Sequence, residues 1–351
     1  MRENGSFGCR FHSGATSCYA PQRVDIFLQQ MINGLTLGSV YAIVALGYTM
    51  VYGIIQLINF AHGEVVMIGA MVAFSVITAL AAGGMPPLVV VGIGTACAIP
   101  ACMAVAYAME RLAYRPLRRA PRLAPLITAI GVSIILQHLA MQVWTRNVIA
   151  FPQIMQNTVH PIGGATITSV QIAILGLCFS IMGGLALLVY RTRLGTAMRA
   201  TAQNPQVAGL MGIDVNRVIA ATFLIGAALG AVAGVMVGTY YGVAQYTMGS
   251  VLGLKAFAAA VLGGIGNIPG AMVGGLLLGV VEALGAGYIG ELTDLCRIAG
   301  STGWLAERCA ADPHFILFGS NYQDVFAFVV LILVLLFRPS GLLGERVGDR
   351  A

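Results

Sequence analysis

The sequence predicts an all-α fold: a polytopic bundle of about eight transmembrane helices, within a range of eight to ten, that includes short or re-entrant glycine-rich segments. Three observations predict it. Of the 351 residues, 58% are hydrophobic and 9% are charged, which leaves too few polar groups for a water-facing surface. The apolar residues form runs of about 20, the length that crosses a bilayer. The 45 glycines interrupt these runs, as expected where helices pack closely in lipid.

The apolar segments follow one another along the chain, separated by polar connections. A short one, at 251–263, is bounded by glycines and contains Lys255, the only lysine of the chain. It is either a short crossing or a re-entrant piece buried in protein, as irregular backbone at membrane depth must be. The other segments lie at about 26–53, 57–80, 87–109, 125–145, 168–190, 217–240, 268–287 and 325–337.

The placement of arginines predicts the orientation. Cytoplasmic loops retain Arg and Lys, so we expect the two arginine-rich connections, 111–122 and 191–217, to face the cytoplasm. Arginines after the last span predict a cytoplasmic C-terminal tail at 341–351. Because successive spans cross the membrane in opposite directions, the connections at 146–167 and 288–324 are then outside. The N-terminus is then also outside, unless the first run holds two short helices broken near Gly47 or Gly53.

Two segments differ from the transmembrane domain at 25–340. Residues 1–24 are polar and lack the apolar region of a signal peptide, so we expect a polar tail whose residues 1–23 are dispensable. A start codon at Val24 is the alternative. Residues 289–320 form a predicted outer insertion with Cys296 and Cys309, where an oxidising compartment permits a disulfide. Two reduced thiols are the alternative.

Missing motifs exclude several function classes. The sequence has no G-x-x-x-x-G-K-[ST] phosphate loop, no G-x-S-x-G, no H-E-x-x-H and no C-x-x-C, and its five histidines are scattered. The net charge of +6 comes without interleaved aromatic and basic residues, so we expect no nucleic acid partner. We therefore predict that the chain is not an enzyme and binds neither a metal nor a cofactor.

The connection at 191–217 carries signals for two short helices. Gly195 can close the preceding span, and TAMRATAQ favours a first short helix. Asn204 is a good N-cap with Pro205 at the first helical position. The second helix would end near residue 211 with Gly212 as a left-handed cap, and Asp214 would cap the next span.

This helical connection predicts a docking surface for a partner protein. Arg199 and the apolar side chains of Val207, Leu210 and Met211 would be exposed on it. A solvated amphipathic loop without a partner is the alternative.

Polar residues inside the apolar runs are the other candidates for function. Asn59 and His62 lie at the break NFAHG, which Glu64 follows, while Lys255 and Glu282 lie within apolar runs. Ionisable groups at this depth usually face the bundle interior and pair. We expect at least two of the three charged residues to meet, either lining or gating a path or forming a structural ion pair. For His62 we favour an interfacial histidine over a proton relay.

Four stretches of the sequence resemble one transporter family. They are QQMINGLTLGSVYAIVALGYTMVYGIIQLINFAHGEVVMIGA, GTAMRATAQNPQVAGLMGIDVNRVIA, KAFAAAVLGGIGNIPGAMVGGLLLG and LILVLLFRPSGLLG. In this order they closely resemble the permeases of branched-chain amino-acid ABC importers, specifically the shorter, LivH-like one. The resemblance covers about 25–288 and 321–344, so the tail and the outer insertion depart from it.

The resemblance implies an assembly in the bacterial inner membrane. It consists of two homologous permeases, two cytoplasmic ATPase subunits that bind ATP and Mg, and a periplasmic amino-acid-binding protein. The connection after residue 193 would be the segment that sits in a groove of the ATPase. The residues we expect at that contact are Arg199, Ala200, Asn204, Ala208, Gly212 and Asp214.

The substrate implied is a branched-chain or other small amino acid. Urea and short amides are the alternative substrates, because relatives with this architecture are associated with them. The rival from another class is a self-contained ion-coupled transporter, in which Glu64 and Glu282 would carry protons or sodium.

Overall fold

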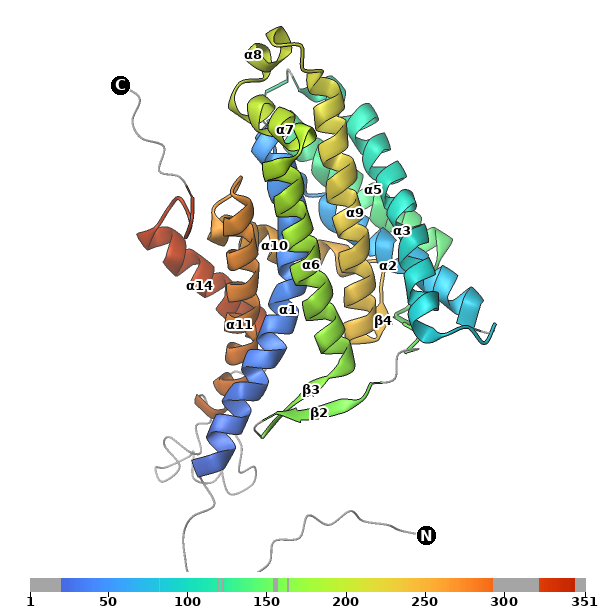
Figure 1. Cartoon of the computed structure of the whole chain (residues 1–351), viewed down its shortest axis with the longest axis vertical. Coiled ribbons are helices and arrows are strands. Elements are labelled where there is room, and N and C mark those ends of the chain that lie inside the picture. The colour runs from blue at the N-terminus through green and yellow to red at the C-terminus, as the bar shows by residue number, and fades with distance from the viewer. Residues whose placement is uncertain are drawn as a thin grey trace, which may run out of the picture.

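A computed structural model confirms the bundle of membrane helices. It describes residues 20–344 except 82, 119, 122, 154–156, 163 and 293–321. In these residues seven helices are long and apolar enough to cross a membrane, and two shorter apolar helices accompany them (Figure 1). The long ones are α1 (Ala20–Ile55), α2 (His62–Ala81), α3 (Pro87–Met109), α5 (Leu123–Val143), α6 (Ser169–Arg191), α9 (Val215–Tyr241) and α11 (Ile268–Leu292). The shorter ones are α10 (Met248–Gly263) and α14 (Gln323–Phe337).

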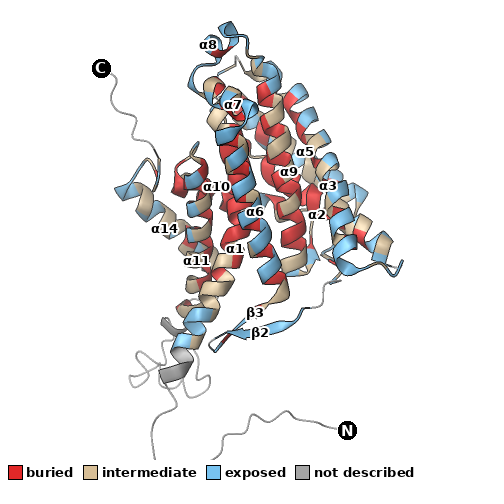
Figure 2. Ribbon diagram, viewed as in Figure 1, coloured by how far each residue is buried: buried red, intermediate tan, exposed pale blue. Residues whose placement is uncertain are grey.

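Helix α1 is the central element of the bundle. It runs without interruption, so the alternative of two short helices broken near Gly47 or Gly53 is wrong. The buried stretch from Val40 to Leu46 packs against neighbouring helices on all sides (Figure 2). Its first residues belong to the segment predicted as a polar tail, because the helix begins at Ala20.

Several predictions about the ends and the insertion fall outside the described residues. These are the first 19 residues of the tail, residues 345–351, and most of the insertion with Cys296 and Cys309.

Close approaches of α1 and α11 depend on glycine. A Cβ atom added at Gly279 would lie 2.2 Å from the backbone nitrogen of Gly38, and one added at Gly38 would lie 2.7 Å from the carbonyl oxygen of Leu276. Backbone atoms in a packed interior have little room to move. The glycines therefore set the distance between these helices, as predicted for packing in lipid.

Replacing Gly279 by valine is expected to destabilise the bundle by about 3 kcal/mol or more, because the added atoms overlap the backbone of α1. Gly176→Val is the matched control, since a Cβ there meets no atom within 4 Å. Thermal unfolding of the purified protein in detergent would measure both. Equal melting temperatures for the two variants would contradict the packing described here.

The chain returns to α10 after α14. The backbone nitrogens of Leu342 and Leu343 donate to the carbonyl oxygens of Leu262 and Gly263 at 2.9 and 3.0 Å. The Asn267 side chain donates to the carbonyl of Leu343 at 2.7 Å. The two backbone bonds satisfy carbonyl groups that the end of α10 leaves free. The segment after α14 therefore closes the turn between α10 and α11.

Two short antiparallel ribbons were not predicted from the sequence. Strand β1 (Ile149–Ala150) pairs with β4 (Val243–Ala244), and β2 (Val159–Ile162) pairs with β3 (Ala165–Thr168). Strands of two to four residues are too short to show an alternating pattern. The ribbons lie at one end of the bundle, opposite the short helices α7 (Arg193–Gln203) and α8 (Pro205–Leu210) (Figure 1).

Candidate functional site

The two short helices predicted at 191–217 are present as α7 and α8. Asn204 caps α8, with its Oδ1 accepting from the backbone nitrogens of Gln206 and Val207 at 3.0 and 3.1 Å. Asp214 caps α9 in the same way. Gly212 has a φ of +84°, so its predicted left-handed conformation is confirmed. Helix α8 ends one residue earlier than predicted.

The prediction that Gly195 closes the preceding span is wrong. Helix α6 ends at Arg191, and Thr192 follows it directly as the N-cap of α7, accepting from the backbone nitrogen of Gly195 at 3.1 Å. A Cβ at Gly195 would lie 2.2 Å from the carbonyl oxygen of Val189. This glycine permits a sharp corner between two helices. Sequence reasoning took the glycine as the stop signal and missed the threonine.

The outer surface of α7 and α8 is apolar as well as basic. Leu210 and Met211 are 87% and 79% exposed, and Val207 is exposed next to them. Arg199 is also exposed, with its guanidinium carbon 5.6 Å from the centre of the Tyr190 ring. Large apolar side chains at a water-facing end of a protein usually mark a contact with another protein. We call these three apolar side chains and Arg199 the docking face.

The other predicted contact residues differ in exposure. Asn204, Gly212 and Asp214 are exposed, Ala200 is half-buried, and Ala208 is buried. Ala208 therefore packs on the inner side of α8 and is not available for contact with a partner.

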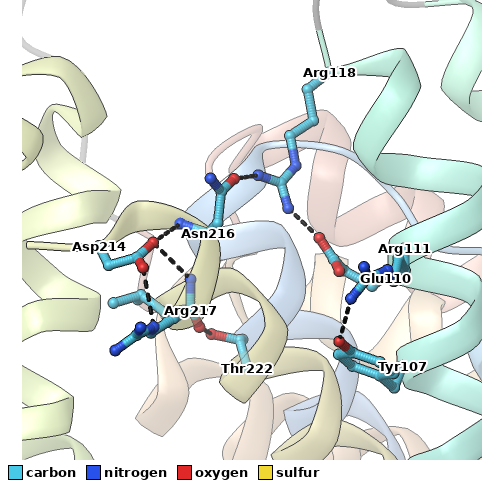
Figure 3. A network of polar contacts seen from close by, with 9 residues as sticks. Tyr107, Glu110, Arg111, Arg118, Asp214, Asn216, Arg217 and Thr222 are labelled. Carbon is cyan, nitrogen blue, oxygen red and sulfur yellow. Dashed lines mark hydrogen bonds and ion pairs between the residues drawn. The ribbon is translucent and has the colours of Figure 1, made fainter.

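The two arginine-rich connections meet at the end of the bundle that bears α7 and α8. Arg118 donates to the side-chain oxygen of Asn216, at the start of α9, at 2.7 Å and forms an ion pair with Glu110 (Figure 3). Glu110 begins a π-helical turn (Glu110–Tyr114) that continues α3 into α4 (Arg115–Leu117). Burial lowers the pKa of the Arg118 guanidinium, and Glu110 acts in the opposite direction. This contact confirms that the two connections share one side.

Two of the three charged residues predicted inside the membrane meet, as expected. Nζ of Lys255, on α10, lies 2.8 Å from Oε1 of Glu282, on α11. The Tyr41 hydroxyl, on α1, donates to the other oxygen of Glu282 at 3.0 Å. A third group, Asp324, was missed because it was assigned to the outer connection. It lies in the first turn of α14, with Oδ1 2.6 Å from the same Lys255 nitrogen. One cation therefore joins three helices.

The third charged residue, Glu64, has no charged partner among the described residues. It is fully buried in the first turn of α2, and its Oε1 accepts from Ser133 and Gln137 of α5 at 3.0 and 2.7 Å. Its Oε2 has no hydrogen-bond partner in the described chain. Sequence reasoning found this carboxylate but not the two donors, which lie about seventy positions further along the chain.

Asn59 and His62 are packed at the start of α2. Asn59 accepts from the Tyr114 hydroxyl at 2.7 Å. His62 is 3% exposed, with its ring edge-on to Tyr48 at 4.9 Å between centroids. It is therefore a buried residue of the bundle, and its interfacial depth stays a prediction. In the described part of the chain no three His, Cys, Asp or Glu residues gather as they would around a metal ion.

A pocket of about 950 Å³ lies beside the docking face. Thr49, Tyr52 and Gln56 line it from the end of α1, Arg199 lines it from α7, and Ser340 lines it from the segment after α14. Gln56 has a φ of +54°, which is uncommon for a residue other than glycine. The end of the central helix thus opens into a cavity next to the docking face.

Comparison with known proteins assigns the chain to a family. Residues 30–335 match the family described as branched-chain amino acid transport system / permease component. The high-affinity branched-chain amino acid transport system permease protein BraD of Pseudomonas aeruginosa is 48% identical over 91% of this chain and 96% of its own length. LivH of Escherichia coli K12 is 45% identical with the same coverage. A probable LivH of Methanocaldococcus jannaschii is 26% identical over 91% of this chain and 94% of its own length. No solved structure matches. The chain belongs to the branched-chain amino acid transport permease family.

Proposed function

We propose that the chain is the membrane-spanning permease subunit of an ATP-driven importer of branched-chain amino acids. The observation that carries the proposal is the docking face, a rigidly capped pair of helices with exposed apolar side chains at the end of a membrane bundle. Relatives that match nearly the whole chain are named permease proteins of such transport systems. A permease that provides only the translocation pathway needs a separate ATPase subunit, and the docking face provides a surface for contact with it.

The partners follow from this assignment. The complete importer consists of this chain, a homologous second permease, two ATPase subunits that hold Mg-ATP, and a periplasmic binding protein. The docking face contacts an ATPase subunit in the cytoplasm, and the pocket beside it lies at the cytoplasmic mouth. The complex resides in the bacterial inner membrane with the C-terminus of this chain inside. The shared side of the two arginine-rich connections supports this orientation.

Reconstitution of the complex tests the proposal. The two permeases, the two ATPases and the leucine-loaded binding protein are assembled in proteoliposomes, and leucine uptake is measured with ATP. Uptake should require hydrolysable ATP and persist in the presence of a protonophore. Uptake by the permeases alone that a protonophore abolishes would favour the ion-coupled transporter instead.

The binding protein decides the substrate class. Calorimetric titration with leucine, isoleucine, valine, urea and acetamide should give binding for the amino acids. Binding of urea or acetamide alone would replace the amino acid in the proposal and leave the ATP-driven mechanism in place.

A further inference from the structure

The carboxylate of Glu64 is half satisfied. Both of its donors, Ser133 and Gln137, bind the same oxygen, Oε1, while Oε2 is buried without a hydrogen-bond partner in the described chain. An ionised carboxylate accepts about four hydrogen bonds, and a buried one is unfavourable unless it is paired. The carboxylate can thus accept more hydrogen bonds than the described part of the chain donates to it.

The lysine within the apolar helices is already engaged elsewhere. Lys255 contacts Glu282 and Asp324 at 2.8 and 2.6 Å, and Glu64 forms no ion pair among the residues that the structure describes. Its free oxygen lies against the backbone of α10, where a Cβ added at Gly249 would be 2.5 Å away. Because Gly249 has no side chain, Oε2 faces backbone there and receives no side-chain hydrogen bond from this position. A cation for Glu64 would therefore come from outside the described part of the chain.

The helix that supplies both donors is lightly attached. On α5 only Pro125, Ala129 and Ala140 are fully buried. The other hydrogen bond from this region to α2 runs from the Trp144 ring nitrogen to the Ser75 hydroxyl at 2.7 Å. The residues that α5 contributes to the buried core are small, Ala129 and Ala140, with Val132 and Leu136 partly buried against it. Moving α5 away from α2 would therefore expose few large buried side chains and would free Oε1 as well.

We propose that Glu64 receives the amino group of the transported amino acid, which replaces the Ser133 and Gln137 donors when α5 moves away from α2. This inference rests on the proposed function. An α-ammonium group carries one positive charge and three donors, so it suits a carboxylate with a free oxygen. Urea and short amides carry no charge and gain less from this group. The residue therefore favours amino acids over neutral amides inside the membrane.

The first test removes the charge and keeps the shape. Glu64→Gln retains an oxygen that accepts from Ser133 and Gln137, but it has no charge for an ammonium group. In the reconstituted complex, leucine delivered per ATP hydrolysed is expected to fall at least tenfold, and Glu64→Asp should recover part of it. A ratio in Glu64→Gln within twofold of wild type would overturn the inference. Leucine uptake by the wild-type complex tests the proposed function separately.

A matched control removes a structural bond between the same helices. Trp144→Phe loses the hydrogen bond to Ser75 and leaves the carboxylate untouched, so its leucine-to-ATP ratio should stay within twofold of wild type. A fall as large as that of Glu64→Gln would show that attachment of α5 matters and that the charge does not.

The second test identifies the group that binds. Isopentylamine is leucine without its carboxylate, and 4-methylpentanoate is leucine without its amino group. At millimolar concentration the amine should inhibit leucine delivery by wild type but not the residual delivery by Glu64→Gln, and the acid should inhibit neither. Gln137→Met removes a competing donor, so the amine should inhibit it at lower concentration than wild type. Equal inhibition by amine and acid, or weaker amine inhibition in Gln137→Met, would overturn the assignment. Leucine binding to the isolated binding protein, measured with both compounds, excludes an effect there.

Discussion

Replacing Lys255 by methionine is expected to destabilise the folded chain by about 3–5 kcal/mol, the usual effect of removing one partner from a buried ion pair. The change leaves the fully buried Glu282 carboxylate with the Tyr41 hydroxyl as its one hydrogen-bond partner among the described residues. It also removes the ion pair that Asp324 of α14 forms with the same nitrogen. Thermal unfolding in detergent should show a melting temperature lower by about 10 °C.

An exposed ion pair provides the control for this prediction. Arg217 lies 3.0 Å from Asp214, but its side chain is 89% exposed, so Arg217→Met should change stability by less than about 1 kcal/mol. The double variant Lys255→Met/Glu282→Gln should be more stable than the single variant, because it no longer buries an unpaired charge. A single variant as stable as wild type would show that the buried cation is dispensable for folding.

Placing a charge on the docking face is expected to abolish ATP-driven uptake without unfolding the chain. Leu210 is 87% exposed, so Leu210→Asp removes few contacts within the chain but puts a carboxylate into the proposed apolar contact with the ATPase. Such a buried unpaired charge disrupts binding strongly. We expect leucine uptake to fall more than tenfold and the ATPase subunits to copurify poorly, as measured by size-exclusion chromatography of the complex.

The control introduces the same charge on the same helix. Gln206 is an exposed polar residue in the first turn of α8, and a carboxylate there is compatible with the helix dipole. Gln206→Asp should therefore keep most of the uptake. If Leu210→Asp transports and copurifies like wild type, the ATPase subunit contacts a surface other than the docking face.

The geometry of the docking face depends on one backbone conformation. The φ of +84° at Gly212 disfavours a β-branched residue, and a Cβ there meets no atom within 4 Å. Gly212→Val would thus act through the backbone alone. We expect reduced uptake with a melting temperature close to that of wild type, and unaltered uptake would show that the turn after α8 tolerates another path.

Local signals could be predicted from the sequence, and contacts between distant segments could not. The caps at Asn204, Gly212 and Asp214 were predicted because each depends on residues within three or four positions. The spans followed from apolar runs of sufficient length. The partner of Lys255 on α14 and the donors of Glu64 on α5 are set by how the helices pack, about seventy positions away along the chain. A charged residue within an apolar run could be predicted to need a partner, but the sequence did not show which residue that partner is.

The closure of the turn between α10 and α11 has a consequence for biosynthesis. The residues that complete it, Leu342 and Leu343, follow every helix in the described chain and leave the ribosome after them. Until these two residues are synthesised, the carbonyl groups of Leu262 and Gly263 lack these hydrogen bonds. Lys255 likewise lacks its contact with Asp324 until α14 has been synthesised. A nascent chain that stops before residue 342 thus leaves the end of α10 without the hydrogen bonds that the finished chain supplies.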